Sequence, residues 1–176
     1  MGKTLLVIVA VGAIAYFGWQ QFAAAKLPPE IPFPDATGRI HSFQEYRGRG
    51  QPVLAAFWIQ QCGYSDRTLT LLNSLRSKYP ADRLAVVGFY LNPIEPGELA
   101  ACGQQHGYRF TLVPLQTVGE LGMKDLILSF GIDSAGDVGI LDAQGRVRKF
   151  ISSRNVSPQA FEERVRGAVA ELVPGS

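Results

Sequence analysis

Two nearly unbroken apolar runs lie in the middle of the chain, at residues 53–59 (VLAAFWI) and 84–91 (LAVVGFYL). Runs without polar alternation are typical of strands that are buried on both faces of a sheet. Between them, apolar residues recur at the three-to-four spacing of an amphipathic helix that ends before Pro80. These residues are Leu69, Leu72, Leu75 and Tyr79. A strand, a helix and a strand in this order predict a right-handed crossover between parallel strands.

Turn and stop signals predict the elements that follow. We expect helices over residues 96–106 and 120–130, stopped by the glycines at 107 and 131, with a strand over 110–115 between them. Strands over 138–141 and 147–151 are expected to form an antiparallel hairpin. Its turn is Asp142-Ala143-Gln144-Gly145, where Asp142 and Gly145 serve turn geometry and not catalysis.

A further hairpin and a closing helix complete the predicted domain. A turn at Thr37-Gly38, followed by alternation of Ile40 and Phe43 with polar residues, predicts a small N-terminal hairpin. Ser157 caps and Pro158 opens the last helix. Its apolar stripe is Phe161, Val165, Ala168, Val169 and Leu172. Together these elements predict an α/β fold with a mixed central sheet and helices on both faces.

Composition narrows the classes of protein that the chain can belong to. Its 176 residues suit one domain with roughly 25 residues left over. The chain is 47% hydrophobic and only 18% charged, which excludes a disordered or coiled-coil protein. Its net charge is +2, and the basic residues are scattered, so we expect no nucleic-acid partner. Two cysteines and two histidines leave no four-ligand zinc site that keeps a cysteine free, and we expect neither metal nor cofactor.

The left-over residues are at the N-terminus, where residues 4–25 carry no charge between Lys3 and Lys26. A helix of this length can just cross a bilayer of about 30 Å, with Tyr16 and Trp19 suited to the far interface. We therefore predict a membrane anchor that contacts the lipid bilayer through residues 4–25. The domain that follows is then expected in the periplasm or extracytoplasmic space.

A cleaved signal peptide is the alternative interpretation of this segment. Lys3 suits its n-region, residues 5–19 its apolar core, and the alanines at 23–25 its cleavage site. The anchor is favoured because the apolar run is long and aromatic residues close it. Residues 27–34 follow with four prolines, which predict a stiff extended spacer. The expected organisation is an anchor or signal over 1–26, a spacer over 27–34 and a domain over 35–176.

Several short motifs between residues 32 and 62 resemble one known family. They are Phe33-Pro34-Asp35, Gly38, Ser42-Phe43, Tyr46-Arg47-Gly48, Pro52-Val53-Leu54 and Phe57-Trp58. The family is that of the exported, membrane-tethered thioredoxin-like proteins of the TlpA kind, a class of redoxins, and the order of elements matches it over 31–172. The resemblance implies a thioredoxin-like fold with an N-terminal β-hairpin, preceded by a transmembrane helix.

In such proteins, Phe-Trp and three variable residues precede a Cys-X-X-Cys motif that opens a long helix. Here the motif is Cys62-Gly63-Tyr64-Ser65, a Cys-X-X-Ser site. A thiol at a helix N-terminus faces the positive end of the helix dipole, which favours the reactive thiolate. A serine at the second position cannot release a partner from a mixed disulfide. The resemblance thus makes Cys62 and Ser65 the candidate catalytic positions, with the usual dithiol cycle removed.

Two more departures from the family lie at the same site. Counting back from Asp142, the position of the usual cis-proline holds Gly136, and no proline occurs between residues 114 and 158. This loop is expected to follow a different, more mobile path, and whether its backbone still pairs with a substrate strand stays open. Gln61 replaces an aromatic residue that commonly precedes the cysteine. The residues flanking the site are Trp58, Gln61, Gly63, Tyr64 and Gly136.

The second cysteine, Cys102, lies three residues after Leu99 on the apolar face of the helix expected over 96–106. Its default interpretation is a buried structural thiol. The alternative is a resolving thiol that pairs with Cys62 from a distance. His41 and His106 are isolated and are expected at the surface.

Two neighbouring families fit less well. Ala55 and Ile59 occupy the proline and threonine places of the peroxiredoxin signature, which disfavours a peroxidase. Cys-Gly-Tyr-Ser is similar to the Cys-Gly-Phe-Ser motif of monothiol glutaredoxins over four residues only.

Three functional hypotheses remain. The favoured one is monothiol chemistry, in which Cys62 forms mixed disulfides with exported or membrane proteins and assists disulfide exchange or assembly. The second is a redox-inactive accessory or binding subunit of a membrane complex. The third is a two-cysteine catalyst that uses Cys62 and Cys102. Whether the protein is a thiol-disulfide oxidoreductase-like enzyme without its second active-site cysteine stays open at this point.

Overall fold

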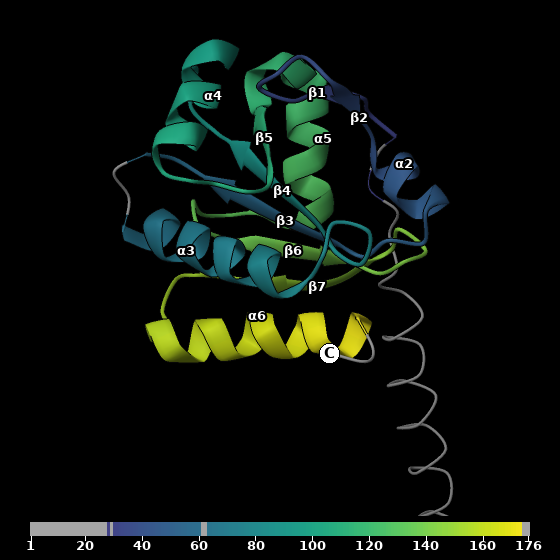
Figure 1. Ribbon diagram of the computed structural model, residues 1–176, viewed down its shortest axis with the longest axis vertical. Helices are drawn as coiled ribbons and strands as arrows, with labels where there is room; N and C mark the ends of the chain where they lie inside the picture. Colours follow the sequence, from purple (N-terminus) through teal and green to yellow (C-terminus); the bar gives the residue numbers. More distant parts are fainter. Residues whose placement is uncertain (1–27, 29, 61–62, 174–176) are drawn as a thin grey trace, which may run out of the picture.

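The computed structural model describes residues 28, 30–60 and 63–173. Its centre is a five-stranded sheet of order β5-β4-β3-β6-β7, in which β3, β4 and β5 are parallel and β6 and β7 are antiparallel additions (Figure 1). The strands are β3 (Val53–Trp58), β4 (Ala85–Tyr90), β5 (Thr111–Pro114), β6 (Val138–Leu141) and β7 (Val147–Ile151). The predicted mixed sheet is confirmed.

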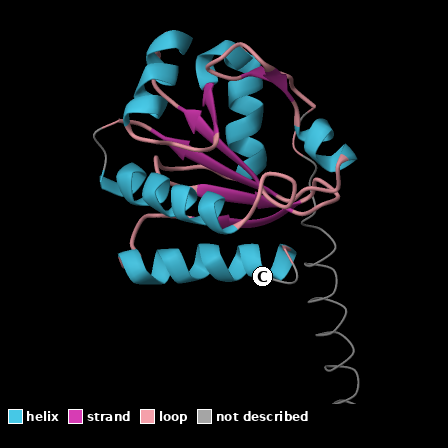
Figure 2. Cartoon of the chain, viewed as in Figure 1, coloured by secondary structure: helices cyan, strands magenta, loops and turns pink. Residues whose placement is uncertain are grey.

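Helices cover both faces of this sheet, as Figure 2 shows. Side chains of β3 alternate between the two faces, because successive residues of a strand point to opposite sides. Leu54, Ala56 and Trp58 pack with α3 (Gly63–Lys78), α4 (Pro96–Gln105) and α6 (Pro158–Leu172). Val53, Ala55 and Phe57 pack with α5 (Glu120–Phe130) and with the N-terminal segment. The α/β architecture with two covered faces therefore follows from the alternation along one buried strand.

The predicted helix ends are confirmed where a cap specifies them. The residue after α5, Gly131, has a left-handed backbone with φ of 68°, and its N–H satisfies carbonyls of the last helical turn. At the other end of the chain, the Ser157 hydroxyl accepts a hydrogen bond from the N–H of Ala160 at 3.1 Å and so caps α6. Between β5 and α5 lies the 3-10 turn η1 (Leu115–Val118), which the sequence pattern does not reveal.

The N-terminal hairpin is confirmed, although it is shorter than the alternation of Ile40 and Phe43 suggests. It consists of β1 (Phe33–Pro34) paired antiparallel with β2 (Ile40–His41). Phe43 does not continue β2 but begins the helix α2 (Phe43–Gly48). The reason is local, because the Ser42 hydroxyl accepts a hydrogen bond from the N–H of Glu45 at 3.1 Å and caps this helix.

The start of the domain and the position of His41 also differ from expectation. Phe33 is fully buried against the α5 side of the sheet, so the folded domain includes β1, two residues before the boundary expected at residue 35. His41, expected at the surface, is 6% exposed, and its ring contacts Asp35 and Tyr46. Both corrections have one cause: the hairpin folds back onto the sheet and brings its polar side chains together.

The segments that carry the predicted anchor and the predicted thiol lie outside the described residues. These are residues 4–25, with the alternative signal peptide, and the pair Gln61 and Cys62. Within the described residues, none of the helices has the length and apolar character needed to span a bilayer.

Candidate functional site

The candidate site lies where β3 ends and α3 begins. β3 ends at Trp58 and α3 starts at Gly63, so only four residues connect the carboxyl end of the strand to the helix. The first residues of α3 present backbone N–H groups and the positive end of the helix dipole to this connection. A thiolate is stabilised in such a position. Of the two predicted catalytic residues, the structure describes Ser65 but not Cys62.

Ser65 is fully buried and is used structurally. Its hydroxyl accepts a hydrogen bond from the backbone N–H of Ile59 at 3.2 Å, which ties the first residue after β3 to the first turn of α3. This bond joins the two described ends of the connection between β3 and α3. The Ser65 side chain therefore holds this connection together instead of projecting into solvent as a reactive group.

Gly136, which the sequence count places at the usual cis-proline position, contacts the first turn of α3. Its φ is +93°, a value that proline cannot adopt because its ring fixes φ near −65°. A Cβ at this position would lie 2.9 Å from both the backbone carbon and the Cβ of Tyr64, and 2.9 Å from the Ser153 hydroxyl. No cis peptide bond occurs within the described residues. Glycine is thus required here by backbone geometry and by close contact with α3.

The expected mobile path of this loop does not agree with its hydrogen bonds. The N–H of Gly136 donates to the carbonyl of Phe57 at 2.6 Å, and its carbonyl accepts from the Thr68 hydroxyl at 2.7 Å. The loop is therefore attached to β3 on one side and to α3 on the other. Because both polar backbone groups of Gly136 are already paired, this residue offers no free edge to an extended substrate chain.

The side chain of Asp137 holds the loop around Gly136 through hydrogen bonds. Its carboxylate is fully buried and accepts hydrogen bonds from the N–H groups of Ser134 and Ser153, each at 2.9 Å. Burial raises the pKa of Asp137, and the hydrogen bond from the N–H of Ser153 partly offsets that rise. Sequence reasoning missed Asp137, Thr68 and Ser153, because each acts through a partner that is distant along the chain. No local motif marks them.

Two aromatic residues, Trp58 and Tyr64, lie close to the connection between β3 and α3. Trp58 is 1% exposed, and its ring centre lies 4.7 Å from that of Tyr90. Its indole nitrogen is buried without a hydrogen-bond partner among the described residues. Tyr64 is 42% exposed, with the Arg67 guanidinium 5.2 Å from its ring centre. Trp58 thus belongs to the core, whereas Tyr64 presents an aromatic surface beside this connection.

Cys102 on α4 is half-buried and lies next to this connection. The side-chain amide of Gln60 donates to the Cys102 sulfur at 3.3 Å, across 42 positions of sequence. The structure therefore places Cys102 close to the residue that precedes Gln61 and Cys62 along the chain.

Metal binding finds no support in the described part of the chain. No group of three or more His, Cys, Asp or Glu side chains there could hold a metal ion.

Comparisons with known proteins identify the fold. No family model matches the chain. Among curated proteins, the thiol-disulfide oxidoreductase ResA of Geobacillus thermodenitrificans is 23% identical over 159 residues, which cover 85% of each chain. The solved thioredoxin domain of a thiol-disulfide oxidoreductase from Bacteroides vulgatus superposes with a TM-score of 0.63 at 17% identity, over 83% of this chain and 97% of its own. This chain has a thioredoxin-like fold.

A second solved structure agrees. The thioredoxin-like domain described here superposes on a thiol:disulfide interchange protein, assigned as DsbE, from Chlorobium tepidum with a TM-score of 0.62. The two are 21% identical over 83% of this chain and 97% of the other. The fold is thus one that thiol-disulfide oxidoreductases use, and the thioredoxin-like fold expected from the sequence is confirmed.

Proposed function

We propose that the protein is a membrane-tethered, exported thioredoxin-like protein whose Cys62 forms mixed disulfides with exported or membrane proteins. One observation carries the proposal: α3 begins at Gly63, so the residue at position 62 directly precedes the N-terminus of a long helix of a thioredoxin-like fold. The helix dipole and the free N–H groups of its first turn favour a thiolate there. The similarity to a curated thiol-disulfide oxidoreductase supports the same chemistry.

The proposed reaction is a single thiol-disulfide exchange. The Cys62 thiolate attacks one sulfur of a partner's disulfide, the partner's S–S bond breaks, and a new S–S bond joins Cys62 to the partner. The displaced sulfur leaves as a thiolate and takes a proton from water. Ser65 cannot reverse this step, because it carries no thiol and its hydroxyl accepts from Ile59. An external thiol must then release the partner, which makes the mixed disulfide a long-lived species.

The proposal also includes a membrane anchor at the N-terminus. Residues 4–25 carry no charge and are long enough to cross a bilayer, with the thioredoxin-like domain on the extracytoplasmic side. Deleting residues 4–25 is expected to release the protein from the membrane fraction of export-competent cells. A deletion variant that stays in that fraction would contradict the anchor.

A two-cysteine catalyst is the second candidate function, and the contact of Gln60 with Cys102 favours it. In this version the Cys102 thiolate attacks the Cys62 sulfur of the mixed disulfide, releases the reduced partner and leaves a Cys62–Cys102 disulfide. A redox-inactive accessory subunit is the third, and the paired backbone groups of Gly136 favour it, because they leave no substrate-binding edge at that residue.

The reactivity of Cys62 tests the proposal most simply in the full-length Cys102→Ser protein, which carries one thiol. The rate of alkylation as a function of pH gives the thiol pKa, and we expect a value clearly below about 8.5, the ordinary value for cysteine. Under oxidising conditions this variant should also trap partner proteins that the Cys62→Ser variant does not trap. An ordinary pKa with nothing trapped would leave the accessory-subunit interpretation.

A further inference from the structure

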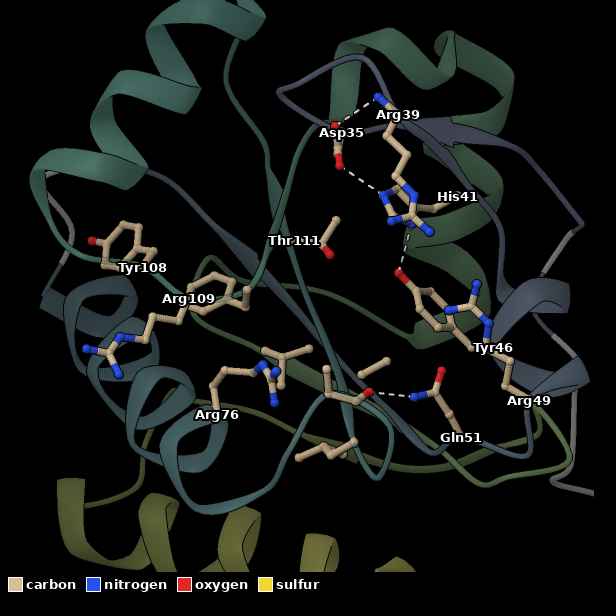
Figure 3. Close-up of a pocket in the computed structure, with 15 residues that line it drawn as sticks. Asp35, Arg39, His41, Tyr46, Arg49, Gln51, Arg76, Tyr108, Arg109 and Thr111 are labelled. Carbon is tan, nitrogen blue, oxygen red and sulfur yellow. Dashed lines mark hydrogen bonds and ion pairs between the residues drawn. The ribbon is translucent and has the colours of Figure 1, made fainter.

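A cavity of about 390 Å³ lies beside the amino ends of β4 and β5 (Figure 3). Ala85 and Val86 of β4 and Thr111 of β5 line it, whereas the connection that contains Cys62 follows the carboxyl end of the parallel strand β3. The cavity therefore lies toward the opposite end of the parallel strands from the candidate thiol site. Its volume is within the range of about 300–1,000 Å³ that is typical of small-molecule sites.

Four arginines surround this cavity, each from a different element or loop. Figure 3 shows Arg76 of α3 pointing toward the middle, with Arg39 and Arg49 on one side and Arg109 at the opposite rim. Several guanidinium side chains beside one cavity are unusual without a counter-charge, because like charges repel one another.

Carboxylates neutralise only half of the arginine charge. Glu45 pairs with both Arg39 and Arg49, through Nη2–Oε1 distances of 3.3 and 2.6 Å. Asp35 is the one carboxylate among the residues that line the cavity. The Arg76 guanidinium donates to a carbonyl, that of Tyr79, and the side chain of Arg109 has no ion-pair partner among the described residues. Four guanidinium groups thus face two carboxylates, which leaves about two positive charges for a ligand.

The inner wall of the cavity is a polar network that is already in place. Asp35 Oδ2 lies 2.9 Å from His41 Nε2, and the Tyr46 hydroxyl lies 3.3 Å from His41 Nδ1. In the neutral ring, Nε2–H donates to Asp35 and Nδ1 accepts from Tyr46. Burial raises the pKa of Tyr46 to about 12, so this hydroxyl stays protonated near neutral pH. The wall therefore adds no further negative charge beyond Asp35.

We propose that this cavity binds the phosphate group of a small phosphate ester. A phosphate monoester carries about −1.5 to −2 charges near neutral pH, which matches the two unpaired guanidinium groups. The planar guanidinium of arginine also binds phosphate oxygens through two parallel N–H donors. The site is independent of Cys62 and goes beyond the proposed thiol chemistry. The ester can be a soluble metabolite or the headgroup of a lipid, since both present the same phosphate chemistry.

Titration of the full-length protein with inorganic phosphate and with glycerol 3-phosphate, followed by calorimetry in neutral detergent, tests this site. We expect saturable binding at low salt that weakens as salt is added, because the attraction is screened. The Arg76→Gln/Arg109→Gln variant should bind at least about tenfold more weakly, since hydrogen bonds to charged groups contribute that much or more. The matched control Arg154→Gln/Arg164→Gln removes two arginines that do not line the cavity and should bind within about twofold of wild type.

A second variant keeps the test decisive if the double variant is unstable. Arg39→Gln removes an exposed side chain whose carboxylate partner, Glu45, retains Arg49, and it should also weaken phosphate binding. To separate the two sources, the titration is repeated in phosphatidylcholine nanodiscs with and without phosphatidic acid. If phosphatidic acid competes with the soluble phosphate, the ligand is a lipid headgroup. If phosphatidic acid does not compete, the ligand is a soluble ester. Absence of saturable phosphate binding, or equal weakening in the control variant, would overturn the site.

Discussion

The two ends of the central sheet differ in how far their polar groups are paired within the protein. At the carboxyl end of β3, the N–H and carbonyl of Gly136 and the hydroxyl of Ser65 are all paired within the protein. At the amino ends of β4 and β5, four arginines face two carboxylates, so positive charge remains unpaired. A group that is already bonded internally contributes to stability, whereas an unpaired charge beside a cavity is available to a ligand.

This contrast separates two roles. The described residues around the connection between β3 and α3 form a support, and any chemistry there depends on the thiol that the connection carries. The arginine-lined cavity needs no reactive group, because charge and shape suffice for binding.

Gly136→Ala should be the most damaging single change at the carboxyl end. A side chain at φ of +93° is strained, and its Cβ would lie 2.9 Å from the Tyr64 backbone carbon, so we expect a loss of about 3 kcal/mol in the free energy of unfolding. Gly167→Ala in α6 is the control, because nothing lies within 4 Å of the added Cβ. Urea unfolding followed by circular dichroism measures both. Equal stability of the two variants would refute a tightly packed loop.

Thr68→Val sharpens the same half of the comparison. It removes the donor to the buried carbonyl of Gly136 while conserving the shape of the side chain, and we expect a loss of about 1–2 kcal/mol. Thr70→Val on the same helix removes a comparable hydroxyl that donates to the carbonyl of Asp66 at an exposed position, where water replaces it. Urea unfolding should separate the two variants clearly. If Thr70→Val lost as much stability as Thr68→Val, the hydrogen bond to Gly136 would contribute no more than an exposed one.

Tyr46→Phe tests the inner wall at the amino end. The variant removes the Tyr46 hydroxyl, which lies 3.3 Å from the buried His41 Nδ1, and leaves Glu45 Oε2 at 3.6 Å from that nitrogen. We expect a loss of about 1 kcal/mol in the free energy of unfolding. Tyr64→Phe is the control, since the Tyr64 ring is partly exposed and its contact with Arg67 uses the ring face. The midpoint of urea unfolding reports the difference. A Tyr46→Phe variant with the same unfolding midpoint as wild type would show that this hydrogen bond does not stabilise the inner wall.

Asp35→Asn should have the smallest effect, visible in the pH dependence of stability. Burial raises the pKa of Asp35, but hydrogen bonds from Thr37, His41 and Arg39 outweigh it and hold that pKa below its ordinary value. A carboxyl with a lowered pKa stabilises the fold above its unfolded-state pKa, and this contribution disappears as pH falls through the folded-state value. The variant should therefore lose less stability than wild type between about pH 5 and pH 2. Parallel acid-unfolding curves would contradict this assignment.

The elements that the sequence predicts well are those specified by residues close together. The apolar runs mark β3 and β4, and the Ser157 cap and Gly131 stop mark helix ends, because each signal is local. The short helix α2 carried such a signal as well, since Ser42 and Glu45 have the spacing of a capping box. The alternation of Ile40 and Phe43 masked it.

The parts that escaped prediction depend on long-range contacts. Gly136 could be located by counting from Asp142, but its fixed path depends on Phe57, Tyr64 and Thr68, which no local pattern connects to it. His41 looked isolated because its partners become neighbours only when the hairpin folds back onto the sheet. The arginine cavity was invisible for the same reason, as its four arginines are scattered along the chain.

The most direct test of the central claim is intact-mass analysis of the full-length protein after reaction with glutathione disulfide. Monothiol chemistry predicts that one glutathione becomes attached to Cys62, that an equivalent of glutathione thiol is released, and that Cys102 remains a free thiol. The Cys62→Ser protein should acquire no glutathione adduct over the same reaction time. An intramolecular Cys62–Cys102 disulfide without an adduct, or a Cys62 thiol that does not react, would contradict the account.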